Sequence, residues 1–510
     1  MAKVMAYDLG TGGIKASLYD ECCDTPVNLF IEYDTFYPED KRHEQRPMDW
    51  WSSVCKSTRI LLDSSRTRPE EIKCLAVSGH SLVAVPMDRN GRLLTDRVPI
   101  WSDTRATGIL DEFFSKVPYE HWYMTTGNGD PAECYSIIKL MWLRRHMPDI
   151  FERTEVVLGS KDFVNYMFTG EKCTDPSYAS GFGIFDLGGW RYSDEFIKAS
   201  GLPAGIFPEI RRSDEIIGKV TASAAEASGL KEGTPVACGG VDNSCMALGA
   251  RGVGEGRVYT SLGSSSWIAV TSRKPVVDIN TRPFVFAHIQ EGFYTSAMSI
   301  FSAGNSFRWL REQLCRDIPK NIDPYMQMDQ WASSIPAGSN GVMFNPSLAG
   351  GSPQDKSPNI RGSFMGISLG STREDMVRAV LEGIALSLRI SLDGLKKHVD
   401  TGDEILFCGG GSKSRVWRQI FSDVFNMKIL KTNIDQNAAS LGAAAIAARA
   451  CGLWDSYEII DSLHKAESTE YPNMENNQKY ESLLEVFKDL SDALADAGDR
   501  MQLLHSKNIW

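Results

Sequence analysis

The sequence Asp8-Leu9-Gly10-Thr11-Gly12-Gly13 decides the fold, because it joins two apolar runs, residues 4–7 and 14–19. This pattern predicts a strand, a tight glycine turn and a second strand. Glycines in such a turn let the backbone approach a phosphate closely, because no Cβ blocks the converging N–H groups. For one turn taken alone, a hairpin that needs glycine only for its backbone angles is the alternative.

The same pattern returns about half a chain later, where Ser261-Leu262-Gly263-Ser264-Ser265-Ser266 also stands between two apolar runs. A repeat at this distance indicates an internal duplication in which each copy opens its own domain. The chain has 510 residues, more than one hydrophobic core usually organises. We therefore expect an α/β chain of two domains, residues 1–252 and 253–510. Two such turns could clamp one triphosphate from opposite sides, which favours phosphate binding over a plain hairpin.

Composition excludes several classes of function. The formal charge of −11 and the absence of a basic stripe argue against a nucleic-acid partner. The eleven cysteines are scattered and form no C-x-x-C pair, which predicts reduced thiols and a cytoplasmic location. No apolar run approaches the roughly 18 residues of a membrane span, and the first residues lack a signal-peptide core. We expect no membrane partner and no secretion.

The groups around the two turns suit a complex of ATP with Mg²⁺. Thr11 and Ser264 offer hydroxyl donors, and Lys15 offers a cation. Asp8 lies directly before the first turn, where a carboxylate would repel phosphates unless a Mg²⁺ ion lay between them. We therefore predict Asp8 near the metal. The alternative is a turn-initiating aspartate bonded to its own backbone.

Asp242 follows Gly239-Gly240 at the end of an apolar strand and precedes a helical stretch. In open α/β sheets, ligands bind beyond the carboxyl ends of the strands. We interpret Asp242 as a general base that accepts the proton of an attacking hydroxyl, as a catalytic aspartate does in protein kinases. A helix N-cap is the alternative, and nothing local separates the two.

Two further segments, Ser78-Gly79-His80-Ser81 and Trp101-Ser102-Asp103-Thr104-Arg105, follow apolar strands. They combine an aromatic face with carboxylate and guanidinium groups, and proteins hold sugars with such sets. A core tryptophan, a surface Asp–Arg pair and a structural histidine are the alternatives. The eight histidines show no i, i+4 pair, so we expect no metal other than Mg²⁺.

The last helical pattern, residues 480–504, places five apolar side chains at helical spacing. We expect an amphipathic helix that packs on a domain. A homodimer contact through this helix is the alternative.

Taken together, these segments resemble the FGGY carbohydrate kinases, in the correct order over nearly the whole chain. The matching segments are Asp8-Leu9-Gly10-Thr11, Glu44-Gln45 with Pro47 and Trp50-Trp51, Trp101-Ser102-Asp103-Thr104-Arg105, Lys161-Asp162-Phe163, Thr169-Gly170-Glu171, Thr174-Asp175 with Ala179-Ser180, Gly239-Gly240-Val241-Asp242-Asn243, Ser261-Leu262-Gly263-Ser264, Arg361-Gly362, Arg378-Ala379, Glu382-Gly383 and Gly409-Gly410-Gly411-Ser412. Within the family, several of these versions most resemble those of xylulose kinases.

The resemblance implies two ribonuclease-H-like domains of the actin and hexokinase type, with a cleft between them. By the same similarity, the sugar lies deep in the cleft and ATP mainly on the second domain. The residues so implied are Asp242 as catalytic base; Asp8, Gly10, Thr11, Gly12, Lys15 and Ser264 around the metal and phosphates; Gly410, Gly411 and Ser414 beside adenosine; and His80, Ser81, Trp101, Asp103 and Asn243 around the sugar.

Three departures from the xylulose kinase pattern bear on the substrate. The loop that usually reads Gly-Gln-Met-His-Gly is Gly79-His80-Ser81-Leu82-Val83 here, Gly350-Gly351-Ser352-Pro353 replaces Gly-Glu-Arg-x-Pro, and Trp267 replaces a smaller residue. Hydrogen bonds in a pocket decide between sugars that differ by one hydroxyl. We expect phosphorylation of D-xylulose to D-xylulose 5-phosphate, with another pentulose, a polyol such as glycerol, or an aldonate such as gluconate as alternatives. Two alternatives from other classes are an actin- or chaperone-like ATPase and a sugar-binding regulator without catalysis.

Overall fold

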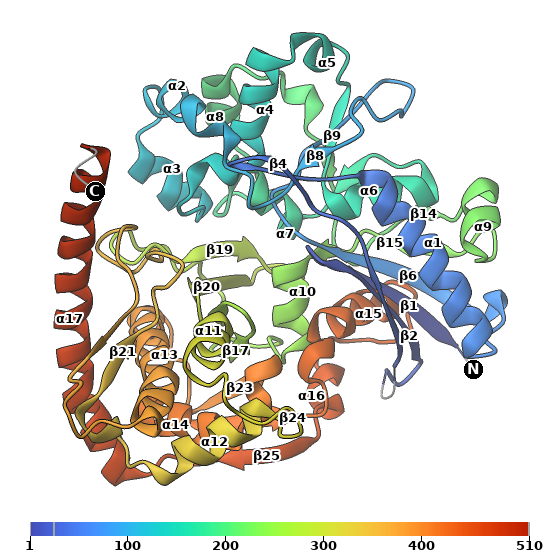
Figure 1. Cartoon of the computed structure of the whole chain (residues 1–510). Helices are drawn as coiled ribbons and strands as arrows, with labels where there is room; N and C mark the ends of the chain where they lie inside the picture. Colours follow the sequence, from blue (N-terminus) through green and yellow to red (C-terminus); the bar gives the residue numbers. More distant parts are fainter. Residues whose placement is uncertain (1, 24–25, 508–510) are drawn as a thin grey trace.

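The computed structural model describes residues 2–23 and 26–507, and two seven-stranded sheets dominate it (Figure 1). The first sheet contains β1 (Lys3–Leu9), β2 (Gly13–Asp20), β3 (Val27–Glu32), β6 (Ile72–Gly79), β14 (Ile216–Lys219), β15 (Pro235–Ala237) and β16 (Gly240–Val241). The second contains β17 (Val258–Leu262), β18 (Ser266–Ser272), β19 (Phe284–Ala287), β20 (Tyr294–Ile300), β23 (Glu404–Cys408), β24 (Lys428–Thr432) and β25 (Ala466–Glu470).

The two sheets share one strand order. In the first it is β3-β2-β1-β6-β15, in which β1, β2 and β3 are antiparallel while β6 and β15 run parallel to β1. In the second it is β20-β18-β17-β23-β24, with the same directions. The remaining strands are additions at the edges, apart from β16, which pairs with β6. The α/β class and the duplication expected from the two glycine turns are confirmed.

Both predicted glycine turns are hairpin turns at equivalent places. Leu9 pairs with Ile14 across the first hairpin, and Leu262 pairs with Ser266 across the second. The Gly10 N–H donates to the Gly13 carbonyl at 3.0 Å, and the Gly263 N–H donates to the Ser265 carbonyl at 3.0 Å. Each turn closes tightly and leaves its tip outside the sheet.

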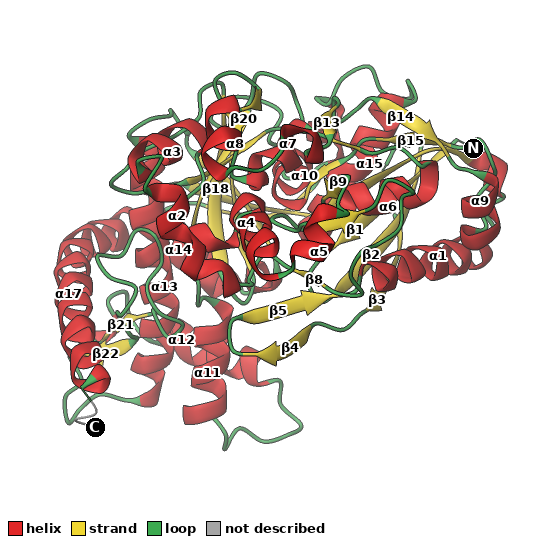
Figure 2. Cartoon of the chain, turned by 90° about the horizontal axis from the view of Figure 1, so that it is seen from above, coloured by secondary structure: helices red, strands yellow, loops and turns green. Residues whose placement is uncertain are grey.

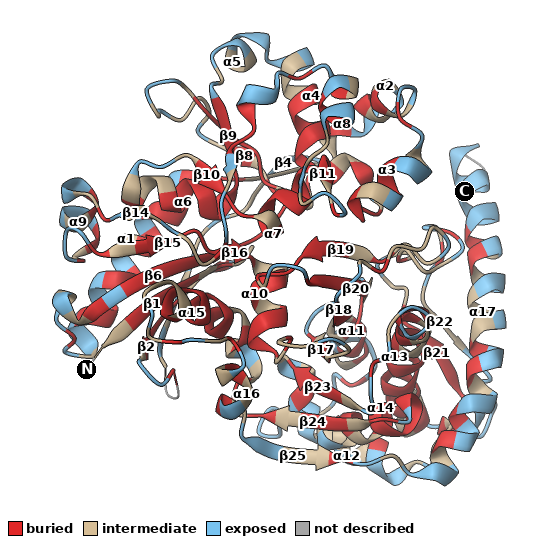
Figure 3. Cartoon of the chain, turned by 180° about the vertical axis from the view of Figure 1, so that it is seen from behind, coloured by how far each residue is buried: buried red, intermediate tan, exposed pale blue. Residues whose placement is uncertain are grey.

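Helices α10 (Asp242–Gly249) and α15 (Ala438–Ala450) lie between the sheets, buried through most of their length (Figure 3). Helix α15 packs on β1 and β6 of the first sheet, and α10 contacts β18, β19 and β20 of the second sheet as well as β6 of the first. The second half of the chain therefore gives α15 to the first sheet, and α10 of the first half bridges both sheets. One hydrophobic cluster joins residues of both sheets and both helices.

Glycines set how closely these two helices cross. A Cβ on Gly442 would lie 2.0 Å from the Cys245 carbonyl oxygen, and one on Gly249 would lie 1.8 Å from the Ala438 carbonyl oxygen. Neither distance is compatible with a side chain. The crossing therefore brings backbone against backbone, and no larger residue fits without separating the halves.

Other helices cover the outer faces of the sheets. Helices α1 (Pro47–Ser64) and α6 (Ser160–Thr169) cover the first sheet, and α13 (Arg373–Lys396) and α14 (Arg415–Phe425) cover the second. Residues 105–152 and 176–207 form a largely helical region with its own hydrophobic cluster above the first sheet (Figure 1).

The expected C-terminal helix is confirmed as α17 (Met474–Ser506), which begins six residues before the predicted range. Tyr480, Leu484 and Phe487 are buried against the second half, while Val486 is 46% exposed. The homodimer alternative stays a prediction. Across residues 2–23 and 26–507, no helix combines the length and apolar character needed to cross a membrane.

The helix crossing yields a stability test. Gly442→Ala is expected to lower the free energy of unfolding by about 1–3 kcal/mol, because the new methyl group meets the Cys245 carbonyl. Gly254→Ala is the matched control, since nothing lies within 4 Å of its Cβ position. Urea unfolding of both variants measures the difference. Equal stability would show that the crossing has room to relax.

Candidate active site

The carboxyl ends of parallel strands gather the predicted catalytic residues. In the pairing of β1 with β6, Asp8 lies opposite Ser78 and Leu9 opposite Gly79. Strand β16 pairs with the other side of β6, so that Val241 also lies opposite Gly79. Asp8 and the first residue after β16, Asp242, therefore flank the end of β6. This is the edge where open α/β sheets bind ligands.

Asp8 and Asp242 influence each other electrostatically. Burial and, second, the charge of Asp8 raise the pKa of Asp242 to about 7. Burial also raises the pKa of Asp8, against a hydrogen bond that Ser78 Oγ donates to Asp8 Oδ1 at 2.9 Å and against the charge of Lys15. A carboxyl group with a pKa near neutrality can exchange a proton at working pH.

The capping alternative for Asp242 is wrong. Helix α10 begins at Asp242 itself, its N-cap residue is Val241, and no side chain caps it. Asp242 Oδ1 accepts a hydrogen bond from the N–H of Asn243 at 2.8 Å. The carboxylate therefore bonds the N–H of the second helical residue, but it does so from the first helical position and not from the N-cap position.

The first glycine turn contacts the predicted sugar segment. Trp101 Nε1 donates to Thr11 Oγ1 at 2.8 Å, while the indole stays 46% exposed. Gln45 Nε2 donates to the Thr11 carbonyl at 2.7 Å, and Tyr33 donates its hydroxyl to the Gly10 carbonyl. No heavy atom beyond the chain neighbours lies within 4 Å of the Cβ position of Gly12. Gln45 and Tyr33 therefore anchor the carbonyl groups of the turn, and its tip at Gly12 stays open.

The second turn is fixed to the start of α11 (Gly304–Leu314). The Ser264 carbonyl accepts hydrogen bonds from the N–H groups of Ala303 at 3.0 Å and Asn305 at 2.9 Å. The Gly263 carbonyl accepts one from Gly304 at 2.9 Å. Ser264 itself is exposed, so its hydroxyl is free to meet a ligand.

One loop, η8 (Asp435–Asn437), links the two halves of the predicted nucleotide site. Lys15 Nζ donates to the Gln436 carbonyl at 2.5 Å. Asp435 Oδ1 accepts from the N–H of Gly409 at 2.8 Å and from Ser412 Oγ at 3.1 Å. The lysine predicted to meet phosphates thus lies beside the glycine loop that follows β23.

The residues predicted to border adenosine lie on the glycine loop that follows β23 and directly after it. Gly410 is exposed, with nothing within 4 Å of its Cβ position, whereas a Cβ on Gly411 would meet the Leu262 side chain at 2.4 Å. Gly411 therefore packs on the base of the second turn. Ser414 caps α14 by accepting a hydrogen bond from the N–H of Trp417 at 3.1 Å.

His80 is buried and neutral at physiological pH, because desolvation lowers its pKa to about 4. Its Nδ1 lies 3.3 Å from the Leu9 carbonyl, a contact that requires the proton on Nδ1. Nε2 is then an acceptor, and it has no partner among the described residues. The neighbouring Ser81 is also buried. An unsatisfied acceptor beside a strand end suits a hydroxyl ligand.

Asp103 belongs to a buried ion pair. Its Oδ2 lies 2.7 Å from Arg105 Nη2 and accepts from the His43 N–H at 2.8 Å. Arg105 also bonds Glu44 at 2.6 Å. The Asp–Arg pair considered from the sequence exists, but it is internal rather than on the surface. Direct sugar contact by Asp103 and by Asn243, which follows Asp242, stays a prediction.

A fully buried ion cluster supports the loop that carries Asp242, and sequence reasoning assigned it no role. Lys161 Nζ lies 2.5 Å from Asp162 Oδ1 and 3.0 Å from Asp175 Oδ1. The same Nζ donates to the Cys238 carbonyl at 3.2 Å. Asp175 accepts from Ser177 Oγ, whose oxygen accepts from the Val241 N–H at 2.9 Å. These bonds fix the backbone on both sides of Gly239-Gly240. The available signal was a charged pair directly after the apolar strand β9 (Val156–Leu158).

Lys139 ties the two sugar segments together. Its Nζ donates to the Leu82 carbonyl at 2.9 Å and to the Ile100 carbonyl at 2.6 Å. Burial lowers its pKa to about 8. The two loops that carry His80 and Trp101 therefore share one buried anchor.

The site fits a magnesium–nucleotide complex better than a protein-built metal centre. In the described part of the chain, no cluster of three or more His, Cys, Asp or Glu side chains could hold a metal. Mg²⁺ usually keeps several waters and binds through one or two carboxylates plus substrate phosphates. Asp8, with one oxygen bonded to Ser78, offers such a carboxylate beside an open glycine turn.

Two family models match the sequence. The N-terminal and C-terminal domain models of the FGGY family of carbohydrate kinases match residues 3–249 and 258–451. Among curated relatives, a xylulose kinase of Bacillus subtilis (strain 168) is 28% identical over 492 residues, which cover 96% of this chain and 97% of the relative. A gluconokinase of the same strain is 26% identical over 501 residues, with 96% of each chain covered.

Solved structures agree over nearly the whole length. A xylulose kinase from Rhodospirillum rubrum superposes with a TM-score of 0.89 at 26% identity, covering 98% of this chain and 100% of the other. A gluconate kinase from Lactobacillus acidophilus gives a TM-score of 0.90 at 23% identity, with 98% and 99% covered, and supports the fold alone. The two-domain fold that the resemblance implied is confirmed.

The raised pKa of Asp242 has a cost in stability that can be measured. Its folded pKa of about 7 exceeds the unfolded value near 4, so stability falls as pH rises from about 4 to about 7. Asp242→Asn lacks this loss and is expected to be about 2–4 kcal/mol more stable than wild type at pH 8, but not at pH 4. Exposed Asp40→Asn is the control, and urea unfolding at both pH values is the measurement. A pH-independent difference would contradict the assigned pKa.

Proposed function

Because this chain belongs to the FGGY family of carbohydrate kinases, we propose that it phosphorylates a hydroxyl of D-xylulose, with Asp242 as the base. The chain is a sugar kinase of the xylulose, gluconate and glycerol kinase type, and kinases of this family use ATP as phosphate donor. The observation that carries the catalytic assignment is the Asp8–Asp242 pair, which lies at the strand ends and has a base pKa near 7. The chemistry follows from that pair.

In the proposed reaction, Asp242 takes the proton of the sugar hydroxyl as the hydroxyl oxygen bonds to the γ-phosphorus. The bond from that phosphorus to the bridging oxygen breaks, and ADP leaves. ATP supplies the phosphoryl group, and Asp8 would hold a Mg²⁺ ion, which would offset the charge of the phosphates. Backbone N–H groups at the tips of the two turns contact the phosphates, apart from those of Gly10 and Gly263, which bond within their own turns. Thr11, Lys15 and Ser264 add side-chain donors. Gly410, Gly411 and Ser414 border adenosine.

The sugar is proposed to lie between the loops that Lys139 anchors. His80 Nε2 accepts a sugar hydroxyl, and the exposed face of Trp101 covers carbon-bound hydrogens. Ser81, Asp103 and Asn243 complete the pocket. D-xylulose is favoured by the motif versions and by several curated relatives named xylulose kinase. Identities of 26–28% span relatives named for different substrates, so another pentulose, glycerol or gluconate stays open.

We also place the domain boundary at residues 252–253 and propose that the halves approach each other when sugar and ATP bind. Each proposed phosphate turn lies on a different half, so one triphosphate must touch both. Closure around the α10–α15 crossing would exclude water and suppress wasteful hydrolysis.

Asp242→Asn tests the base. Phosphorylation of D-xylulose is expected to fall by about 10² or more, with nucleotide affinity nearly unchanged, because the amide keeps the size but accepts no proton. The assay follows ADP formation with D-xylulose, D-ribulose, glycerol and D-gluconate. ADP formation that no sugar accelerates would instead support an actin- or chaperone-like ATPase. Unchanged turnover in the variant would remove Asp242 from the base role.

The pH profile tests the carboxylate pair. The unprotonated form of Asp242 is the active one, so kcat/KM should rise with pH and level off above about 7. Asp8→Asn removes the neighbouring negative charge and should move the acidic limb down by about one pH unit, besides lowering the rate. Asp20→Asn, at the far end of β2, should leave the limb in place. If the acidic limb stayed in place in Asp8→Asn, burial alone would set the pKa of Asp242.

A further inference from the structure

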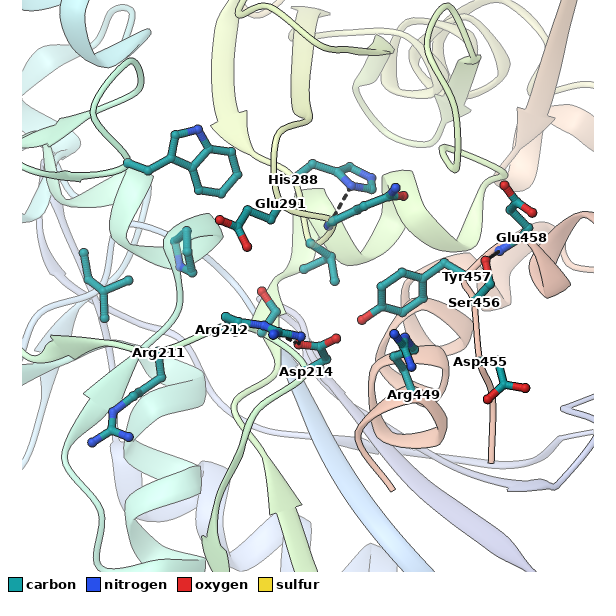
Figure 4. A pocket seen from close by; sticks show the side chains of 16 residues that line it. Arg211, Arg212, Asp214, His288, Glu291, Arg449, Asp455, Ser456, Tyr457 and Glu458 are labelled. Carbon is teal, nitrogen blue, oxygen red and sulfur yellow. Dashed lines mark hydrogen bonds and ion pairs between the residues drawn. The ribbon is translucent and has the colours of Figure 1, made fainter. Parts of the chain in front are cut away.

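A hollow of about 530 Å³ is lined by residues of both halves and by no residue of the two glycine turns (Figure 4). The first half lines it with the segment after β13 (Glu209–Ile210), and the second half with the β19–β20 turn and the segment between α15 and α16 (Ile459–Leu463). Figure 2 shows β13 and β20 at the edge of the molecule opposite β4 (Phe36–Glu39) and β5 (Arg42–Gln45). The volume is in the range of small-molecule sites.

Polar groups of both halves converge in this pocket. Arg212 and Asp214 of the first half form an ion pair at 2.7 Å, and Tyr457 and Arg449 of the second half point toward them (Figure 4). Tyr457 is 8% exposed, and its hydroxyl has no hydrogen-bond partner among the described residues. Burial and the charge of Asp214 raise the pKa of Tyr457, and the two arginines oppose this shift, so all four groups lie within electrostatic reach.

Arg449 has a charge that the described residues do not neutralise. Its single hydrogen bond there is a 3.4 Å contact from Nη1 to the Trp454 carbonyl, and it takes part in no ion pair within residues 2–23 and 26–507. A half-buried guanidinium next to an unpartnered phenol hydroxyl presents donors to an anionic acceptor. These donors could bind a carboxylate.

The rim restricts what such a ligand can be. Glu291, Asp455 and Glu458 are exposed at the pocket and disfavour a polyanion, while they can accept hydrogen bonds from hydroxyl groups. Ile289 and Trp190 supply apolar wall for a carbon chain. We propose that this pocket binds a small hydroxylated acid with one carboxylate, which Arg449 and Tyr457 hold between the two halves.

An occupant of this pocket lies directly behind the loop that carries Asp242. The Ser213 carbonyl accepts a hydrogen bond from the Gly239 N–H at 3.0 Å, and Ser213 Oγ donates to Asp175 at 2.8 Å. Ile289 packs on Gly240 so closely that a Cβ there would lie 2.3 Å from Ile289 Cδ1. The ligand thus touches residues that fix the loop from Gly239 to Asp242. Any effect on turnover rests on the proposed function, but binding does not.

Calorimetric titration with D-gluconate tests the site, with uncharged D-gluconamide as the matched probe. Gluconate is expected to bind the wild-type protein, and Arg449→Met should weaken that binding about tenfold or more, because a charged hydrogen bond is lost. Tyr457→Phe should weaken it by about threefold to tenfold. The control Arg500→Met replaces an exposed arginine on α17 and should change nothing.

Gluconate held in the catalytic cleft would survive Arg449→Met, so equal affinity of the variant and the wild type overturns the site. Equal affinity for gluconamide overturns the role of the carboxylate. Hydrogen exchange gives a readout independent of catalysis: gluconate should slow exchange at the Gly239 amide at least threefold in wild type and not in Arg449→Met. Unchanged exchange in wild type overturns the link to the catalytic loop. A failed kinase assay would leave all of these measurements interpretable.

Discussion

The crossing of α10 and α15 is the constraint on which the rest of the molecule depends. Gly249 and Gly442 bring the two helix backbones into contact, and this contact sets the spacing of the two sheets. Helix α10 begins with Asp242, so the proposed base belongs to the helix that forms the joint between the two halves.

The site places two carboxyl groups close together, which is unfavourable, and a buried ion cluster supports the backbone next to them. Asp8 and Asp242 lie close enough to raise the pKa of Asp242, which costs stability at neutral pH. The cluster of Lys161, Asp162 and Asp175 fixes the backbone beneath them with fully buried charges. A buried cluster of this kind loses several kcal/mol if one member is removed, so it resists rearrangement. Rigid support of this kind is what holds two like charges together.

Local pattern was enough to predict the hairpins, the duplication and the strand-end position of Asp8 and Asp242, because glycine turns between apolar runs have few alternatives. It could not predict that the Asp103–Arg105 pair is buried and bonded to the His43 backbone and to Glu44, since these two partners lie far away in sequence. It also could not show that Asp242 is the first helical residue rather than a cap, which depends on one backbone position. The roles of Lys161 and Lys139 could not be predicted either, because each lysine also binds a backbone carbonyl that only the folded chain brings near.

Helix α15 of the second half covers the first sheet, and this arrangement has a consequence for folding during synthesis. The first sheet has its central strands by residue 79, but α15, which covers one of its faces, ends at residue 450. At the usual rate of synthesis, about 20–70 s separate these two points. During that interval the apolar face of β1 and β6 lacks its native cover and is exposed to association with other chains. The first sheet can therefore complete its native packing only after α15 has been synthesised.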